Sequence, residues 1–360
     1  MRVTRQVHLG RVAIGGGAPV SIQSMTNTDS ADPDATLAQV RSLAAAGCEI
    51  IRVAVPNRRC VASFATICRQ SPLPVIADIH FSAELAVAAI EAGAAGVRIN
   101  PGNLGGPDEL GRVAAAARAA GIPIRVGVNS GSLEKDLLET YGHPTASALA
   151  ESARRHCRRL EAMGFQQIKV SIKASDVRTT VEANRLFAAD TDYPLHLGVT
   201  ESGTATRGII KSAVGIGALL LDGIGDTVRV SLTAPPEEEI RAAIGILEAA
   251  GLREAWPDLV SCPTCGRTTV DLIRLVGEVE AAIAGIKAAG GRIELRRIAI
   301  MGCAVNGPGE AREADLGIAG EAHGGVLFRR GEVVRRLRET ELLPALLEEI
   351  RAHTVFRPVQ

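Results

Sequence analysis

The sequence predicts an α/β protein, a (β/α)8 TIM barrel followed by a smaller α/β domain, and three observations favour this fold. An alanine-rich helix that ends in glycine and leads into an apolar strand recurs along the chain. Eight such strands fit within about 250 residues, as this barrel requires. From about Ala255 the period breaks and cysteine-bearing segments begin, so we place the domains at residues 1–254 and 255–360.

Helix ends and starts mark the repeats in order. Alanine-rich segments end at Gly47, Gly93, Gly121 and Gly164, and glycine is the residue expected just past a helix C-terminus. Asp32-Pro33 combines an N-cap acid with proline at the first helical position. The expected strands are 20–25, 49–55, 74–80, 96–100, 124–128, 167–172, 194–199 and 227–232.

A doubly wound sheet is the alternative fold. It would require a reversal of strand order and a glycine-rich nucleotide loop, and the sequence gives no sign of either. Residues 15–17 are all glycine, and we interpret them as a hairpin turn joining two short strands ahead of the first barrel strand.

Composition narrows the class of protein. The 360 residues are 46% hydrophobic with a formal net charge of zero, so neither nucleic acid nor a membrane is expected as the principal partner. Residues 1–8 lack the apolar core of a signal peptide, and the longest apolar run, near 213–221, is too short to span a bilayer. Seven cysteines without disulfide-like regularity agree with a reducing compartment. We expect a cytoplasmic protein.

Two segments near the C-terminus present three thiols and a carboxylate among glycines and prolines. They are residues 261–267, Ser-Cys-Pro-Thr-Cys-Gly-Arg, and residues 301–310, Met-Gly-Cys-Ala-Val-Asn-Gly-Pro-Gly-Glu. Iron in a sulfide cluster prefers thiolate, and a carboxylate would hold its iron less firmly. The pattern indicates an iron–sulfur cluster with one exchangeable corner, and its candidate ligands are Cys262, Cys265, Cys303 and Glu310.

Other metal and redox sites share part of this pattern. A structural zinc site needs four Cys or His ligands, and the histidines downstream of Cys303 are His323 and His353. A thioredoxin-like pair would leave Cys303 and Glu310 without a role. Both alternatives remain open on spacing alone, with zinc the stronger of the two.

Cations recur within or at the ends of five apolar strands. They are Arg52, Arg98, Arg125, Lys169 with Lys173, and Arg229. A buried guanidinium is costly unless an anion meets it, so convergent cations indicate an anionic ligand such as a diphosphate. Strand parity places Asn129 on the face of Arg125, and Ser231 on the face of Arg229. The alternative is that these cations pair with carboxylates or face the helices.

Further polar residues follow the strands at the end where barrel enzymes carry their chemistry. They include Gln23, Met25, Asp78 and Thr200. We take Glu201 as the candidate proton donor; a solvated loop carboxylate or a helix N-terminal acid is the alternative. His80 and His196 are candidates for the substrate shell only.

These residues resemble the family of bacterial 4-hydroxy-3-methylbut-2-enyl diphosphate synthases of the non-mevalonate isoprenoid pathway. The resemblance runs through nearly the whole chain. It is carried by residues 23–28, 78–81, 97–103 and 223–233, by both cysteine segments, and by 317–320.

The resemblance implies reductive ring opening of 2-C-methyl-D-erythritol 2,4-cyclodiphosphate to 4-hydroxy-3-methylbut-2-enyl diphosphate and water. Flavodoxin or ferredoxin would deliver two electrons singly. It also implies a homodimer in which the cluster domain of one chain caps the barrel of the other.

The family also implies residue roles. Cys262, Cys265, Cys303 and Glu310 would bind a [4Fe-4S] cluster, and substrate oxygen would displace Glu310. Glu201 would act as an acid near the reacting carbons. The diphosphate would be held by Arg52, Arg98, Arg125, Asn129, Lys169, Arg229, Ser231 and Asn306.

Departures from the family pattern are small. Residues 234–236 read Ala-Pro-Pro where an acid before a single proline is more usual, and the insertion domain of plant-type members is missing.

Two other functions remain as alternatives. One is a non-redox barrel transferase, akin to a pterin-binding synthase, with a structural zinc module. The other is a C-terminal region that serves only for docking.

Overall fold

The computed structural model describes the chain except residues 101–102, 105, 255–256, 304–310 and 357–360. The chain divides into two compact units, Met1–Arg253 and Glu254–Gln360. Each unit has its own apolar core. Among the described helices, none combines the length and the apolar character needed to cross a bilayer.

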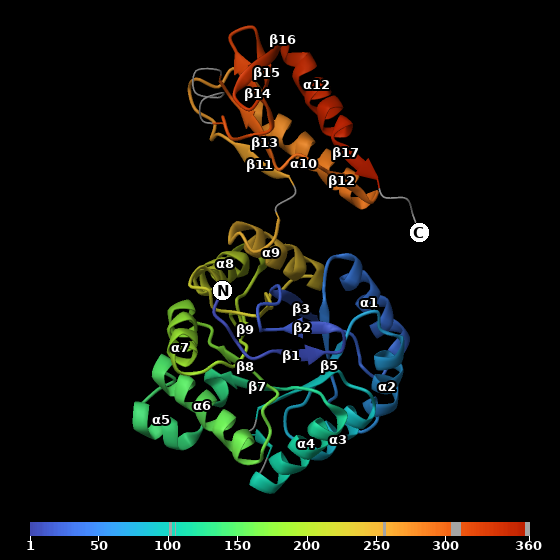
Figure 1. Ribbon diagram of the computed structural model, residues 1–360, viewed down its shortest axis with the longest axis vertical. Helices are drawn as coiled ribbons and strands as arrows, with labels where there is room; N and C mark the ends of the chain where they lie inside the picture. The colour runs from blue at the N-terminus through green and yellow to red at the C-terminus, as the bar shows by residue number, and fades with distance from the viewer. Residues whose placement is uncertain (101–102, 105, 255–256, 304–310, 357–360) are drawn as a thin grey trace. The chain divides into compact units, whose positions relative to one another are not determined.

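The first unit is the predicted barrel (Figure 1). The strand pairs of the barrel sheet are parallel, and a bridge between Val170 and Leu195 joins the two ends of that sheet. The strands run in the order β8-β7-β6-β5-β4-β3-β10-β9. They are β3 (Ser21–Met25), β4 (Ile50–Ala54), β5 (Val75–Asp78), β6 (Gly96–Ile99), β7 (Ile124–Asn129), β8 (Ile168–Lys173), β9 (His196–Leu197) and β10 (Thr227–Val228).

Helices form a ring outside these strands (Figure 1). The predicted cap is present, because Asp32 accepts from the backbone N–H groups of Asp34 and Ala35. Gly121 ends its helix in the left-handed conformation, with φ 67°. The helices are α1 (Pro33–Ala45), α2 (Cys60–Gln70), α3 (Ala83–Glu91), α4 (Pro107–Ala120), α5 (Lys135–Tyr141), α6 (Ala146–Ala162), α7 (Val177–Asp190), α8 (Ala205–Leu221) and α9 (Pro236–Ala249).

The prediction for Gly15 to Gly17 was wrong. The hairpin consists of β1 (Val7–Leu9) and β2 (Val12–Ile14), so its turn is residues 10–11 and the glycine run follows the second strand. These glycines have φ between 62° and 85°, and they turn the chain after the hairpin. Side chains of the hairpin pack on the starts of β4 and β5, so it lies across the N-terminal end of the barrel (Figure 1).

Alternation along the strands separates an apolar face from a charged one. On β7, Ile124, Val126 and Val128 belong to the core between sheet and helices, while Arg125 and Asn129 point to the opposite side. Strands β6 and β8 follow the same rule. Because successive side chains of a strand face opposite sides, the charged set shares the barrel interior.

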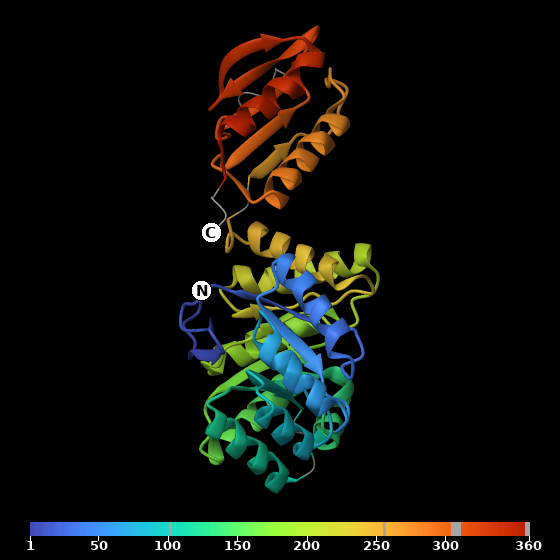
Figure 2. The ribbon, with the colours of Figure 1, turned by 90° about the vertical axis from the view of Figure 1, so that its right-hand side faces the viewer.

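The second unit is a mixed five-stranded sheet with helices on one face (Figure 1 and Figure 2). Its order is β11-β13-β14-β15-β16, and a small second sheet pairs β12 with β17. The elements are β11 (Asp258–Ser261), α10 (Leu272–Ala288), β12 (Gly291–Ile293), β13 (Arg297–Met301), β14 (Leu316–Glu321), β15 (Gly324–Arg329), β16 (Glu332–Leu337), α12 (Glu339–Ala352) and β17 (Thr354–Phe356).

Candidate functional site

The predicted cations converge inside the barrel. In register across neighbouring strands, Asp78 pairs with Arg98, Arg98 with Arg125, and Arg125 with Lys169. Arg98, Arg125 and Lys169 are 7%, 3% and 1% exposed. Burial of several like charges in one interior is unfavourable unless anions join them.

Asp78 is the carboxylate at the centre of this group. Its Oδ2 lies 3.8 Å from Arg52 Nε and 3.3 Å from His80 Nε2, and its Oδ1 lies 3.4 Å from Arg98 Nη1. Arg52 also contacts the Met25 sulfur, at 2.9 Å from Nη2. One buried carboxylate therefore orients two guanidinium groups, from β4 and β6, and an imidazole from the segment after β5.

Other residues shape the space around these cations. A Cβ on Gly127 would come within 2.7 Å of Arg98 Nε, and one on Gly198 would come within 2.5 Å of Lys173 Nζ. When the side-chain nitrogen of Asn129 is oriented to donate to Val128 O, its side-chain oxygen accepts from Arg98 Nη2 at 3.1 Å. Glycine within β7 and directly after β9 thus leaves room for charged side chains to lie across the interior.

Several buried polar atoms in the interior have no hydrogen-bond partner among the described residues. They include Arg125 Nε and Nη1, Lys169 Nζ, Arg229 Nε and His196 Nε2. Within the part of the chain that the structure describes, only Asp78 and Glu239 bring a carboxylate within 4.0 Å of the interior cations. Unsatisfied donors of this kind indicate a polar, anionic ligand.

The pKa values reflect this crowding. Burial lowers the pKa of Arg52 to about 9. Burial, and next the charge of Arg52, lowers the pKa of Arg125 well below its ordinary value. Burial alone would raise the pKa of Asp78, but Arg52, His80 and Arg98 together hold it below its usual range. Because cations outnumber carboxylates, a bound anion would stabilise the whole set.

Glu239 was not predicted from the sequence. Its Oε1 accepts from Leu232 N at 2.9 Å, and its Oε2 lies 3.8 Å from Arg229 Nη2. Burial raises the pKa of Glu239, and Arg229 opposes that rise. It follows Glu237 and Glu238 in the first turn of α9, where a run of acids indicates only a favourable helix start.

The two lysines of β8 lie at different depths. Lys169 is the second residue of the strand and Lys173 the last, so Lys173 lies about 13 Å nearer the C-terminal end of the barrel. Lys173 is in register with Asn129. Of the two, Lys173 occupies the end where barrel enzymes bind substrate, whereas Lys169 lies deep in the interior.

His196 lies within the barrel rather than at its rim. It is fully buried, and its Nδ1 is 2.8 Å from Thr227 Oγ1. Burial, followed by the charge of Lys173, lowers its pKa well below the ordinary value. His196 is therefore neutral near neutral pH and can serve as a hydrogen-bonding group but not as a permanent cation.

Glu201 and Ser231 come from neighbouring segments that follow β9 and β10. Glu201 is exposed and has φ 53°, a left-handed conformation that is strained for a residue with a side chain. Thr233 N donates to Gly203 O at 2.9 Å, which holds the two segments together. Strain of this kind is frequent at functional sites.

The two cysteine-bearing segments, which we call the cysteine loops, begin at the same end of the second unit's sheet. β11 and β13 are parallel neighbours, with Ser261 opposite Ile300, so Cys262 and Cys303 both follow the C-terminal ends of adjacent strands. Gly302 N donates to Cys262 Sγ at 3.1 Å. Backbone N–H donation to sulfur is an interaction that iron–sulfur sites use.

Cys265 is exposed, and the backbone N–H of Arg267 lowers the pKa of its thiol. A thiol that ionises readily is suited to bind metal.

Two predicted residues, Asn306 and Glu310, lie outside the described residues. Among those described, no group of three or more Cys, His, Asp or Glu side chains is close enough to hold a metal ion. The three cysteines nevertheless fit a thiolate-bound group in chemistry and in their position on two adjacent loops.

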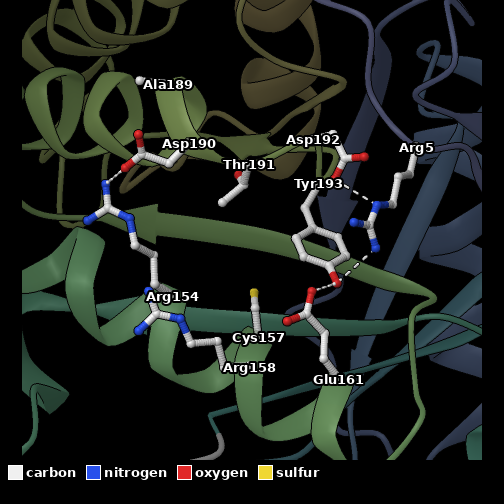
Figure 3. Close-up of a pocket in the computed structure, with 10 residues that line it drawn as sticks. All are labelled: Arg5, Arg154, Cys157, Arg158, Glu161, Ala189, Asp190, Thr191, Asp192 and Tyr193. Carbon is white, nitrogen blue, oxygen red and sulfur yellow. Dashed lines mark hydrogen bonds and ion pairs between the residues drawn. The ribbon is translucent and has the colours of Figure 1, made fainter.

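A separate hollow of about 610 Å³ lies at the other end of the barrel, beside the end of α7 (Figure 3). Arg5, Arg154 and Arg158 line it together with Glu161, Asp190 and Asp192, so its charges balance. Arg5 Nε lies 2.6 Å from Asp192 Oδ1, and Arg154 Nη2 lies 2.6 Å from Asp190 Oδ2. Compensated charges of this kind do not favour an anionic ligand, in contrast to the barrel interior.

Comparison with known families decides the relationship. The GcpE TIM-barrel domain matches residues 4–244, and the GcpE protein C-terminal domain matches residues 258–352. The chain belongs to the GcpE family. It is accordingly an enzyme, an oxidoreductase, as the resemblance implied.

Curated relatives are more than half identical to the chain over the aligned residues. The "4-hydroxy-3-methylbut-2-en-1-yl diphosphate synthase (flavodoxin)" of Geobacter sulfurreducens is 56% identical over 347 residues, covering 96% of this chain and 97% of the relative. The protein of the same name from Desulfotalea psychrophila is 52% identical, covering 97% and 95%. These matches disfavour the pterin-synthase-like alternative.

A solved structure supports the fold alone. The spore coat polysaccharide biosynthesis protein spsE of Bacillus subtilis aligns with a TM-score of 0.50 at 13% identity, covering 69% of this chain and 72% of that one. The coverage corresponds to a barrel-sized part of the chain.

Proposed function

We propose that this chain reductively opens 2-C-methyl-D-erythritol 2,4-cyclodiphosphate to 4-hydroxy-3-methylbut-2-enyl diphosphate and water in the non-mevalonate isoprenoid pathway. The reaction consumes two electrons, which flavodoxin or ferredoxin supplies one at a time. The names of the relatives support both the product and flavodoxin as the donor.

The barrel interior binds the diphosphate in this proposal. The observation that carries the assignment is a set of buried N–H groups on Arg125 and Arg229 that have no hydrogen-bond partner in the described part of the chain. The cations around them also exceed the carboxylates that the structure describes nearby. Anionic oxygens would satisfy these donors. The binding residues are Arg52, Arg98, Arg125, Asn129, Arg229 and Ser231, with Lys173 at the mouth, His196 and Lys169 deeper, and Asn306 from the second unit.

Glu201 supplies a proton in this proposal. An oxygen of the substrate leaves as water, so a proton must reach it. Glu201 follows β9 at the C-terminal side of the strands, in a strained turn, and an exposed carboxyl there can exchange protons with solvent. Glu310 is the second proposed catalytic residue, through its place in the ligand set.

Cys262, Cys265, Cys303 and Glu310 would hold a [4Fe-4S] cluster. Bound there, the cluster would accept single electrons from the donor and pass them to the substrate. The Gly302 N–H, which donates to the Cys262 sulfur, would orient that ligand.

We further propose a cytoplasmic homodimer in which the cluster domain of one chain caps the barrel of the other. An apolar face on α8 and α9 supports self-association. It is a hollow of about 580 Å³ lined by Ile209, Ala213, Val214 and Leu221 among others, and Val214 and Leu221 are 57% and 76% exposed. Exposed apolar patches commonly mark protein interfaces.

Anaerobic turnover tests the proposed reaction. Protein reconstituted with iron and sulfide should convert the cyclodiphosphate to 4-hydroxy-3-methylbut-2-enyl diphosphate when a chemical reductant supplies electrons, with the product identified by mass spectrometry. A preparation that carries four irons per chain but forms no such product would contradict the proposal. So would a colourless, zinc-loaded protein.

Asp78→Asn tests how the interior cations are held. Loss of the carboxylate charge should release Arg52 and Arg98, so that kcat/KM for the cyclodiphosphate falls roughly 10-fold to 100-fold, with most of the loss in KM. Asp190→Asn is the matched control, because Asp190 also pairs with an arginine but is exposed at the opposite end of the barrel. Equal effects of the two variants on KM would show that Asp78 does not position the substrate-binding residues.

A further inference from the structure

One edge of the second unit's sheet is open and basic. Among the described strands, β16 pairs with β15 alone, and its residues from Glu332 to Arg336 are all exposed. We define the basic edge as Val333, Val334, Arg335, Arg336 and Arg338. Exposed edge strands are available for contact with another protein.

A row of paired residues connects the basic edge with the strand that precedes Cys303. Met301, two residues before Cys303, pairs with Ala319, Ala319 pairs with Val326, and Val326 pairs with Arg336. Residues paired across strands share a face, so Arg336 lies on the face that carries Met301. Three strand spacings place it roughly 14 Å from Met301. A protein docked at this edge would therefore lie about three strand spacings from the strand that leads to Cys303.

The charges of the basic edge are available to a partner. Arg335 has no carboxylate within 4.0 Å among the described residues, while Arg336 pairs with Glu321 and Arg338 with Glu341. The side chains of Arg336 and Arg338 are 69% and 80% exposed. Exposed pairs are weak, so carboxylates of a partner can replace Glu321 and Glu341 at little cost.

Apolar groups accompany these arginines. Val333 and Val334 are 48% and 49% exposed. The β15–β16 register shifts beside them, between Leu327 and Phe328, so the edge bulges there. A hollow of about 580 Å³ adjoins Arg336 and Arg338 and includes His323. Arginine is among the residues enriched in protein interfaces.

We propose that the basic edge is the docking surface for an acidic one-electron donor protein, the flavodoxin of the relatives' names. The proposal rests on the proposed function and adds the surface at which electrons enter. Each docked, reduced donor gives up one electron and leaves oxidised by one electron, so two encounters supply the two electrons of one turnover. Attraction between an acidic donor and the arginines steers these encounters.

The test reverses charge at the basic edge in the holoenzyme. Arg335→Glu/Arg336→Glu is compared with Arg274→Glu/Lys287→Glu, an equal charge change on exposed positions of α10. Binding of purified flavodoxin is measured by biolayer interferometry at low and high ionic strength. Turnover is measured with flavodoxin and, separately, with a chemical reductant.

The edge variant should raise both Kd and KM for flavodoxin about 10-fold and flatten their salt dependence, with turnover by the chemical reductant unchanged. The control should match the parent. Arg335→Ala/Arg336→Ala, which introduces no repulsion with Glu321, should show a smaller shift in the same direction.

Three outcomes would overturn the inference: flavodoxin binding within twofold of the parent, an equal shift in the α10 control, or a change of oligomeric state, which would assign the edge to self-association. Failure of the parent enzyme to turn over substrate with any reductant would contradict the proposed reaction instead. Because flavodoxin binding is read independently of turnover, the two failures are distinguishable.

Discussion

Cys303→Ser is expected to give a colourless protein with turnover reduced by at least about 100-fold. The serine hydroxyl is nearly the size of the thiol, so the turn after β13 can form, but it is a harder ligand that ionises far less readily than a thiol. Visible absorption, iron and sulfide content and anaerobic turnover measure the effect.

Cys68→Ser is the matched control for this substitution. Cys68 is half-buried on α2 of the barrel, and burial raises the pKa of its thiol to about 12, so it remains protonated and does not bind metal. This variant should keep the chromophore and turnover of the parent. If Cys303→Ser also kept both, the proposed ligand set would be wrong.

Glu201→Gln should lower kcat by about 100-fold to 10,000-fold, the range typical of removing a general acid. The amide keeps the shape of the side chain but cannot deliver a proton. KM should change little, because the diphosphate is held by the interior cations. Glu91→Gln, at the exposed end of α3, is the control and should have the kinetics of the parent.

Glu201→Gly separates catalysis from folding. Glycine adopts φ 53° without strain, so this variant should raise the free energy of unfolding by roughly 1 kcal/mol while still losing turnover. Thermal unfolding and steady-state kinetics on one preparation give both results. A Gln variant that retained full kcat would exclude Glu201 as the acid and leave its strained turn with a structural role.

Local signals were enough to predict the barrel. A glycine such as Gly121 marks the end of an alanine-rich helix, and an apolar strand begins a few residues later. Each of these signals lies within a short stretch of sequence. The seventh and eighth strands were expected over 194–199 and 227–232 but are shorter. Past Val228 the pairing becomes irregular: Arg229 N donates to Leu197 O at 3.0 Å, and the next contact recorded between these two segments is Thr233 N to Gly203 O at 2.9 Å. Hydrophobic pattern does not show where ladder bonds stop.

Parity predicted which side chains face the interior, but not how deep each one lies. Lys169 and Lys173 share a face, and only the register between β7 and β8 shows that Lys173 is the one beside Asn129. Glu239 was missed because it looks like its neighbours in an acidic helix start; its burial depends on packing across the barrel. Register and long-range packing arise from the whole fold, so a single sequence carries little sign of them.

The cysteine spacing predicted a ligand set but not its arrangement in space. The parallel pairing of β11 with β13 places Cys262 and Cys303 at the same end of the sheet. That pairing joins segments about 40 residues apart, with α10 between them, as parallel strands require. Glu310 and Asn306 lie outside the described residues, so their proposed roles still rest on the family pattern.

Electron paramagnetic resonance of the reduced enzyme, with and without the cyclodiphosphate, tests the central claim most directly. The claim is that a redox-active cluster on the cysteine loops and a diphosphate held by the interior cations act on one substrate. A paramagnetic signal whose g values change on adding substrate, and change less in the Asp78→Asn variant at the same substrate concentration, is the predicted result. A signal that is absent, or identical with and without saturating substrate, would contradict it.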